Sequence, residues 1–234
     1  MTEATHTIVH LLSGGAAQGL VDTLKTDIAA MGIKIEAVFG AVGLMQDKML
    51  GGEPCDIFIS TGAMLRTLAE QERLEAGSIR PLGSVATGIA VKAGAGVSAV
   101  DSAANLRAVL LAAPEVHCPD TRKSTAGIHF AQVLLKLGIA AALVPRLHTH
   151  PNGMTAMRAV AASAEPAALG CTQITEILHT PGVVYAGDLP GEFSLHTVYA
   201  AALAPDAPAA AHDLLELLCG HGGAATRQHC GFKS

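Results

Sequence analysis

Short apolar runs, often rich in β-branched residues, alternate with longer helix-like runs along the first part of this sequence. The runs at 7–12, 33–40 and 55–60 show no polar alternation. Strands of that kind are buried on both faces, as in parallel sheets built from βαβ units. The pattern therefore predicts an α/β fold. Helices are expected between and after these strands, at 16–31, 43–50 and 63–71.

The same alternation starts again after Pro81, so the chain holds two sets of α/β elements of roughly a hundred residues each. Two such sets predict two lobes with a ligand cleft between them. The strands of the second set are expected at 84–92, 115–118, 143–149, 169–173, 183–189 and 195–201, and its helices at 101–112, 124–137, 153–164 and 208–219.

The composition excludes several classes of protein. With 50% hydrophobic and 15% charged residues, the chain can bury enough apolar surface to fold, which excludes a disordered protein. Aromatic residues make up only 3% and the formal charge is −5, so nucleic acid is not an expected partner. The most apolar stretches are about ten residues long, whereas a membrane helix needs about 20. We therefore expect no membrane span.

The first six residues are polar and acidic and show neither the basic nor the apolar region of a signal peptide. On that ground we expect a cytoplasmic protein, or a periplasmic one if a signal peptide has been removed. The five cysteines form no CxxC pair, so neither a zinc site nor a disulfide framework is expected. His148 and His150 point to one face of a strand-like run, which leaves a metal site as the less favoured alternative. We expect no cofactor.

Several of the expected strands end in turns rich in Gly, Ser and Thr. In parallel sheets, ligands bind beyond the carboxyl ends of the strands, where helix N-termini offer unpaired N–H groups to anions. Each turn alone can equally be an ordinary helix cap, and only convergence of several would make an anion site. No dinucleotide-binding, P-loop or nucleophile-elbow motif is present. The turns lie at 13–15, 40–43, 60–62, 123–127 and 151–153.

Four segments carry a resemblance to a known family: IVHLLSGGAAQGLVDTL, EPCDIFISTGAML, CPDTRKSTAGIHFAQVLLKLGI and AALGCTQITEI. In this order they resemble the type II periplasmic binding proteins, and among them the molybdate-binding proteins of ABC transporters. The resemblance implies two lobes joined by two crossovers, near 84–91 and 189–197. It implies a first lobe from 1–84 that is completed by 193–234, and a second lobe over 85–192.

The sequence departs from the molybdate-binding pattern at the residues that hold the oxyanion. The family uses serine hydroxyls and backbone N–H groups at the first two strand ends, but here the first offers Ser13 and the second, at 40–43, has no hydroxyl. The third contact region of the family matches Ala126, and its late tyrosine falls near His196. A tetrahedral oxyanion is therefore less well served than in the family.

Larger titratable groups stand at other strand ends, and we rank His150, His129 and Glu176 as candidate proton-transfer residues, with His196 behind them. Glu176 can also be an early-helix acid, and His129 a core histidine. Cys171 is a weaker candidate nucleophile. Guanidinium groups fit carboxylates in two places at once, so the expected carboxylate clamps are Arg122 and Arg158.

The resemblance extends to the aconitate-isomerase-like members of the family. It implies binding of a di- or tricarboxylate in the cleft and its isomerisation by proton transfer without a cofactor. The alternatives are a solute-binding protein, which would need an ABC permease and export, and a cytoplasmic ligand sensor. The expected ligand-binding residues are Ser13, Gly14, Gly43, Ser60, Thr61, Arg122, Thr125, Ala126, Asn152, Arg158, Cys171, Thr172, Gln173 and His196.

Overall fold

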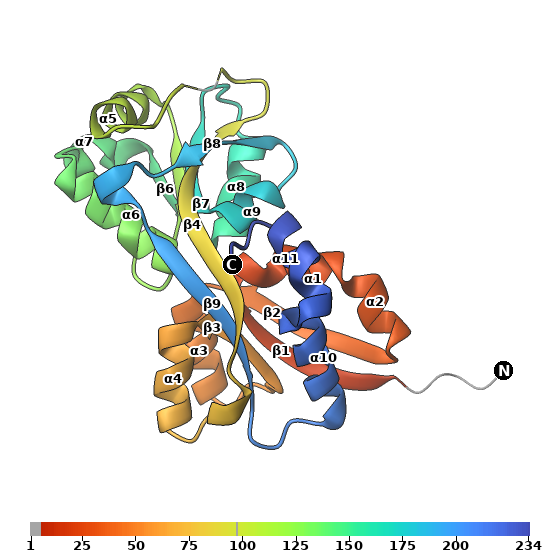
Figure 1. Ribbon diagram of the computed structural model, residues 1–234. Coiled ribbons are helices and arrows are strands. Elements are labelled where there is room, and N and C mark those ends of the chain that lie inside the picture. The colour runs from red at the N-terminus through yellow and green to blue at the C-terminus, as the bar shows by residue number, and fades with distance from the viewer. Residues whose placement is uncertain (1–5, 97) are drawn as a thin grey trace. The chain divides into compact units, whose positions relative to one another are not determined.

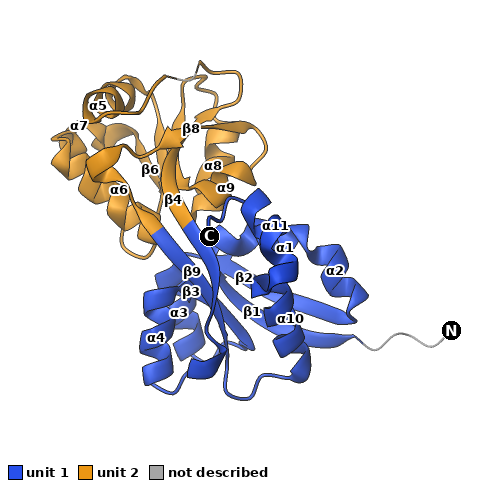
Figure 2. Ribbon diagram, viewed as in Figure 1, with its two compact units in different colours: residues 1–84, 197–234 blue, residues 85–196 orange. Residues whose placement is uncertain are grey.

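The computed structural model describes residues 6–96 and 98–234 and is shown in Figure 1. Residues 1–5, on which the expectation of a missing signal peptide depends, lie outside the described residues. The chain divides into two compact units (Figure 2). Unit 1 comprises residues 1–84 and 197–234, and unit 2 comprises residues 85–196. The predicted lobes change at 84/85 and at 192/193, and their identity as domains stays a prediction.

Unit 1 contains a sheet in the order β2 (Ile33–Gly40), β1 (Thr7–Gly14), β3 (Ile57–Thr61) and β9 (His196–Leu203). The first three strands are parallel, and β9 runs antiparallel to β3. The helices of this unit are α1 (Gln18–Thr23), α2 (Lys25–Ala30), α3 (Val42–Leu50), α4 (Gly62–Glu70), α10 (Ala209–Cys219) and α11 (Ala224–His229), with short 3-10 turns at Gly15–Ala17, Ala76–Ser78 and His221–Gly223.

Unit 2 contains a sheet in the order β4 (Arg80–Lys92), β7 (Leu169–Gln173), β5 (Val116–Pro119) and β6 (Leu147–His150), and β8 (Val183–Asp188) also pairs with β4. Strands β5, β6 and β7 are parallel, whereas β4 runs antiparallel to β7. The helices are α5 (Ala103–Ala112), α6 (Thr125–Lys136), α7 (Ala140–Leu143), α8 (Gly153–Ala162) and α9 (Ile174–Leu178), with 3-10 turns at Val144–Arg146 and Gly191–Phe193.

The sheet of unit 2 is buried on both faces. On one face, Ile89 of β4 and Cys118 of β5 pack with Phe130 of α6 in a large apolar cluster that α5 completes. On the other face, the next residue of β4, Ala90, packs with Met157 of α8. Apolar side chains on successive strand residues therefore pack against helices on opposite faces of the sheet. This arrangement explains why these strands lack polar alternation in the sequence.

The α/β fold predicted from the sequence is confirmed, and β2 and β7 have the bounds that the sequence predicts. The helix expected at 16–31 is wrong as a single element, since it divides at Leu24 into α1 and α2. The strand expected at 143–149 is also wrong over its first half. The alanine-rich residues from Ala140 favour a helix, so α7 and a 3-10 turn precede a strand that begins only at Leu147.

Over residues 6–96 and 98–234, no single helix is both long and apolar enough to cross a membrane. One pair, α6 with the segment Ala140–Arg146, passes the length and composition criteria together but is bent by 118° at its break.

Gly127 allows α6 to begin directly against the end of β5. A Cβ atom at this position would lie 2.3 Å from the Asp120 carbonyl oxygen and 2.4 Å from that of Pro119. Backbone atoms cannot move aside as a flexible side chain can. The glycine of the TAG turn therefore sets how closely the N-terminus of α6 approaches the strand end.

We predict that Gly127→Ala lowers the free energy of unfolding by about 1–3 kcal/mol, because the added methyl group forces α6 away from β5. Urea unfolding followed by circular dichroism measures the change. Gly96→Ala is the matched control in the same unit, since a Cβ there meets no atom within 4 Å. Equal stability of the two variants would contradict the prediction.

Candidate functional site

The parallel strands β5, β6 and β7 end at Pro119, His150 and Gln173, and these ends form the carboxyl edge of unit 2. Each strand leads into a helix whose first turn lies at this edge: α6, α8 and α9. The first N–H groups of a helix have no partner within the helix. The carboxyl edge of unit 2 therefore collects hydrogen-bond donors.

The N-terminus of α6 offers its donors without a side-chain cap. Ser124 occupies the N-cap position, but its hydroxyl makes no capping hydrogen bond, and Thr125 and Ala126 follow as the first helical residues. Just before them, the backbone N–H groups of Arg122 and Lys123 donate to one oxygen of Asp120, at 2.7 and 2.9 Å. These bonds lower the pKa of Asp120. Arg122, an exposed residue, thus lies two residues before the N-cap of a helix whose first N–H groups have no side-chain cap.

The N-terminus of α8 is instead occupied by a carboxyl group of the protein itself. Glu176, only 4% exposed, accepts hydrogen bonds from the backbone N–H groups of Gly153, Met154 and Gln173. The hydroxyl of Thr172 donates a further bond of 2.5 Å to its Oε2. Burial raises the pKa of Glu176 to about 7, although these four donors favour the carboxylate. The side chain of Glu176 therefore holds α8 against α9.

Gly153 leaves the space that the Glu176 carboxyl group fills. A Cβ atom on Gly153 would lie 1.9 Å from Glu176 Oε2 and 2.0 Å from Thr172 Oγ1. Asn152, the preceding residue, caps α8 by accepting bonds from the N–H and hydroxyl groups of Thr155, at 2.8 and 2.9 Å. The turn at 151–153, which the sequence indicated as a ligand site, is thus already hydrogen-bonded to residues of unit 2 itself.

Two buried hydroxyl groups at the carboxyl edge of unit 2 make no hydrogen bond to the described residues. They belong to Thr87 of β4, which is 1% exposed, and Thr175 of α9, which is 3% exposed. Thr87 stands opposite Gln173 in the β4–β7 pairing, so both hydroxyls lie next to the end of β7. A buried hydroxyl without a partner costs about 1–3 kcal/mol, a cost that a polar ligand can remove.

His150 ends β6 and is half-buried at the same edge. Its Nε2 atom lies 3.0 Å from Nδ1 of His117, whose Nε2 lies 3.1 Å from Oε2 of Glu115. The hydroxyl of Ser163 donates to this same carboxylate oxygen at 2.6 Å. The ring of His148 stacks on His117 with the centroids 5.0 Å apart. Burial is the main cause that lowers the pKa of both His117 and His150.

The other candidate residues of unit 2 have different environments. His129 on α6 lies 2.7 Å through Nε2 from the carbonyl oxygen of Phe193, which can only accept, so this nitrogen carries a proton. Arg158 on α8 is exposed, and so is His196 at the start of β9. Cys171 requires a correction, because its side chain is completely buried in the apolar cluster and burial raises the pKa of its thiol. We assign Cys171 to packing.

The ligand residues predicted for unit 1 gather at the carboxyl ends of its parallel strands. Ser13 Oγ donates to the carbonyl oxygen of Gly14 at 2.9 Å, and Ser60 Oγ donates to the sulfur of Met64 at 3.0 Å. Thr61 Oγ1 caps α4 by accepting the Met64 N–H at 3.3 Å. Gly43 is the second residue of α3, which has no side-chain cap. The hydroxyls at this edge are thus engaged within unit 1.

Sequence reasoning missed three residues of interest. Tyr199 of β9 is buried opposite Thr61, with its ring 3.3 Å from the place a Cβ of Gly14 would take. The sequence feature that could have drawn attention to Tyr199 is that the chain has only two tyrosines. Glu115 and His117 were also missed. Their spacing of two residues on a strand puts them on one face, which is the signal that was available.

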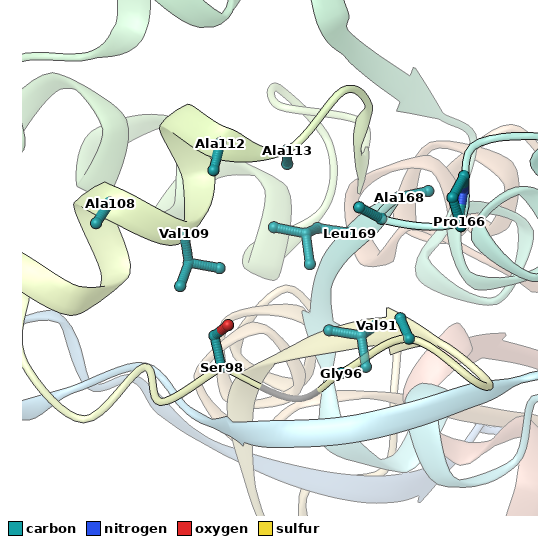
Figure 3. Close-up of a pocket in the computed structure, with 12 residues that line it drawn as sticks. Val91, Gly96, Ser98, Ala108, Val109, Ala112, Ala113, Pro166, Ala168 and Leu169 are labelled. Atoms are coloured by element: carbon teal, nitrogen blue, oxygen red, sulfur yellow. The ribbon is translucent and has the colours of Figure 1, made fainter.

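An apolar cavity of about 500 Å³ in unit 2 lies apart from these polar groups, near the start of β7 (Figure 3). Val109 and Ala112 of α5, Leu169 of β7 and Val91 of β4 contribute to its wall. Ser98 supplies the one side-chain hydroxyl among its lining residues. This cavity does not suit an anion.

A family model described as bacterial extracellular solute-binding protein matches residues 10–233. The chain belongs to this solute-binding protein family. An aconitate isomerase from Pseudomonas sp. is 24% identical over 97% of this chain and 87% of its own length.

Solved structures share the fold of this family member. The periplasmic molybdate-binding protein of Azotobacter vinelandii superposes with a TM-score of 0.80 at 18% identity, covering 97% of this chain and 99% of its own. The sulfate-binding protein SubI of Mycobacterium tuberculosis gives a TM-score of 0.75 at 15% identity, covering 97% and 86%. The predicted resemblance to molybdate-binding proteins is thereby confirmed for the fold.

We predict that the stability contributed by Glu176 falls as pH rises. Its pKa in the folded chain, about 7, is above the ordinary value of 4.5, so folding favours the protonated form. The contribution is complete below pH 4.5 and is lost between 4.5 and 7, by roughly 3 kcal/mol. Urea unfolding at pH 5 and pH 8 measures this for the wild type and Glu176→Gln, whose side chain does not titrate.

The stability of the wild type relative to Glu176→Gln should therefore be greater at pH 5 than at pH 8. A difference between the two proteins that stays constant, or that grows with pH, would mean that the four donors keep the carboxylate ionised throughout.

Proposed function

We propose that this member of the solute-binding protein family binds a small di- or tricarboxylate at the carboxyl edge of unit 2 and isomerises it by proton transfer. The observation that carries the proposal is His150, a half-buried histidine at this edge whose Nε2 atom lies 3.0 Å from Nδ1 of His117. The buried hydroxyls of Thr87 and Thr175 lie at the same edge near the end of β7, which β5 separates from β6. The full-length similarity to a protein named aconitate isomerase supports this class of substrate and reaction.

The carboxylates of the substrate have suitable partners at this edge. The uncapped N–H groups at the start of α6 and the exposed guanidinium of Arg122 suit one carboxylate. The buried hydroxyls of Thr87 and Thr175 can each donate one hydrogen bond to another. Glu176 fills the start of α8, so we assign no substrate carboxylate to that helix.

The proposed reaction is a 1,3-allylic proton shift in an unsaturated tricarboxylate such as aconitate. His150 takes a proton from the methylene carbon, and the electron pair of that C–H bond forms a new double bond to the central carbon. The original double bond becomes part of a dienolate on the neighbouring carboxylate. Return of the proton to the former vinyl carbon restores neutrality of the base and moves the double bond, with no net change in protons.

Different residues of the chain have different roles in this proton transfer. His150 is suited to act as a base because burial lowers its pKa and keeps the imidazole neutral near pH 7. The fixed N–H donors of α6 stabilise the charge that develops on the carboxylate in the dienolate. His129 keeps one nitrogen bound to a backbone carbonyl, and the carboxyl group of Glu176 already accepts hydrogen bonds from four donors of unit 2, so we rank both behind His150.

Family membership favours a second candidate function, which is capture of the same anion without conversion. A solute-binding protein of this kind would return its ligand unchanged. The two candidates share the binding site and differ only in turnover.

We predict that the wild type interconverts cis- and trans-aconitate, and that His150→Gln lowers kcat by about 10²- to 10⁴-fold with little change in KM. Proton NMR of the substrate mixture over time measures both. His212→Gln, which changes an exposed histidine of α10 in unit 1, is the control and keeps full activity.

Binding of aconitate by the wild type without any conversion would favour the solute-binding candidate. Undiminished turnover in His150→Gln would remove His150 from the mechanism.

A further inference from the structure

A row of hydrogen-bonding side chains runs from the partly buried end of α8 to His150. It runs from Ser163 at the end of α8 to Glu115, then to His117 of β5 and to His150 of β6. The contacts are 2.6, 3.1 and 3.0 Å long. The end of α8 brings Ser163 to Glu115, the spacing of two residues places Glu115 beside His117, and the β5–β6 pairing brings His117 to His150. Such a row can transmit a preference for one proton position from one end to the other.

The proton positions follow from the chemistry of each group. Hydrogen bonds from Ser163 and His117 lower the pKa of Glu115, so its carboxylate is ionised at neutral pH and can only accept. His117 Nε2 must therefore carry a proton. A neutral imidazole has one donor and one acceptor nitrogen, which leaves Nδ1 of His117 as the acceptor.

His150 is the donor in the remaining contact. Because Nδ1 of His117 accepts, the hydrogen between the two rings belongs to Nε2 of His150. The lone pair of His150 is then on Nδ1. An isolated histidine would exchange between its two tautomers, and this contact removes that freedom.

His117 and His150 have this arrangement of donors and acceptors only when both rings are neutral. Burial is the first cause that lowers the pKa of both histidines, and the charge of His148 lowers them further. Glu115 acts in the opposite direction on His117. The titratable groups that act on His150 are His117 of β5 and His148 of β6, and both lower its pKa.

We infer that Glu115 and His117 are positioning residues that hold His150 in its Nε2–H tautomer and leave Nδ1 as the atom that accepts the substrate's proton. The second half of this inference rests on the proposed function. The ring of His148, stacked on His117, supports the orientation of that ring without taking part in the row. Loss of the Glu115 charge should weaken catalysis without removing any group that touches substrate.

Histidine ¹⁵N NMR tests the tautomer directly. At pH 8 the wild type should show His150 with a protonated Nε2 and an unprotonated Nδ1. In Glu115→Gln, the new amide can donate to His117, so His150 should change toward a mixture of tautomers. His117→Phe, which leaves no acceptor, should do the same. His148→Phe keeps a ring for stacking and should leave the tautomer of His150 unchanged.

Kinetics on aconitate provide the second measurement. Glu115→Gln should lower kcat by about tenfold to a hundredfold and leave KM nearly unchanged, as expected when a base loses its orienting partner. It should also lower the apparent pKa of the basic group in the pH profile, because the charge that favours a protonated His117–His150 pair is gone. His148→Phe should keep the wild-type kcat.

The two measurements separate this inference from the proposed function. A wild-type His150 protonated on Nδ1, or the same tautomer in Glu115→Gln as in the wild type, overturns the inference whatever the turnover. The expected tautomer in a wild type that converts no carboxylate supports the positioning row and overturns its catalytic use.

Discussion

Parallel strands that end side by side place the first turns of their helices at one edge, and the chemistry of unit 2 depends on this constraint. At that edge, N–H groups that a helix cannot use internally must find partners in side chains, water or a ligand. Unit 2 meets the requirement in two ways. Glu176 bonds to the start of α8, whereas the start of α6, whose N-cap lies two residues after Arg122, has no side-chain cap. This difference is why the proposed function assigns a substrate carboxylate to α6 and none to α8.

Unit 2 buries several polar groups, and burial of a polar group lowers the stability of the fold unless the group is hydrogen-bonded. A carboxyl group that is 4% exposed, two hydroxyls without partners among the described residues, the buried His117 and the half-buried His150 all lie on or near one sheet edge. Each such group lowers stability when it lacks a full set of partners. In unit 1, by contrast, the hydroxyls of Ser13, Ser60 and Thr61 bond within their own segments. The substrate site proposed for unit 2 would account for this contrast.

The sequence predicted the parts of this edge that depend on local pattern. Strands of apolar residues followed by glycine- and serine-rich turns located β5, β7 and the starts of α6 and α8, whereas only the second half of the strand expected at 143–149 corresponds to β6. It could not predict that Glu176 reaches α8, because the acid and Gly153 are far apart in the chain and meet only through the packing of α9. His150 was a candidate from its position, but its partner His117 lies 33 residues earlier and depends on the β5–β6 register.

In the proposed function, His150 removes and returns a proton on a bound unsaturated carboxylate. Incubation of the protein with trans-aconitate in deuterium oxide, followed by proton NMR, tests it most directly. We expect cis-aconitate that carries deuterium at the carbon receiving the returned proton, and we expect both isomerisation and deuterium uptake to be lost when His150 is replaced by Gln. Binding of aconitate with neither isomerisation nor deuterium uptake would contradict the account.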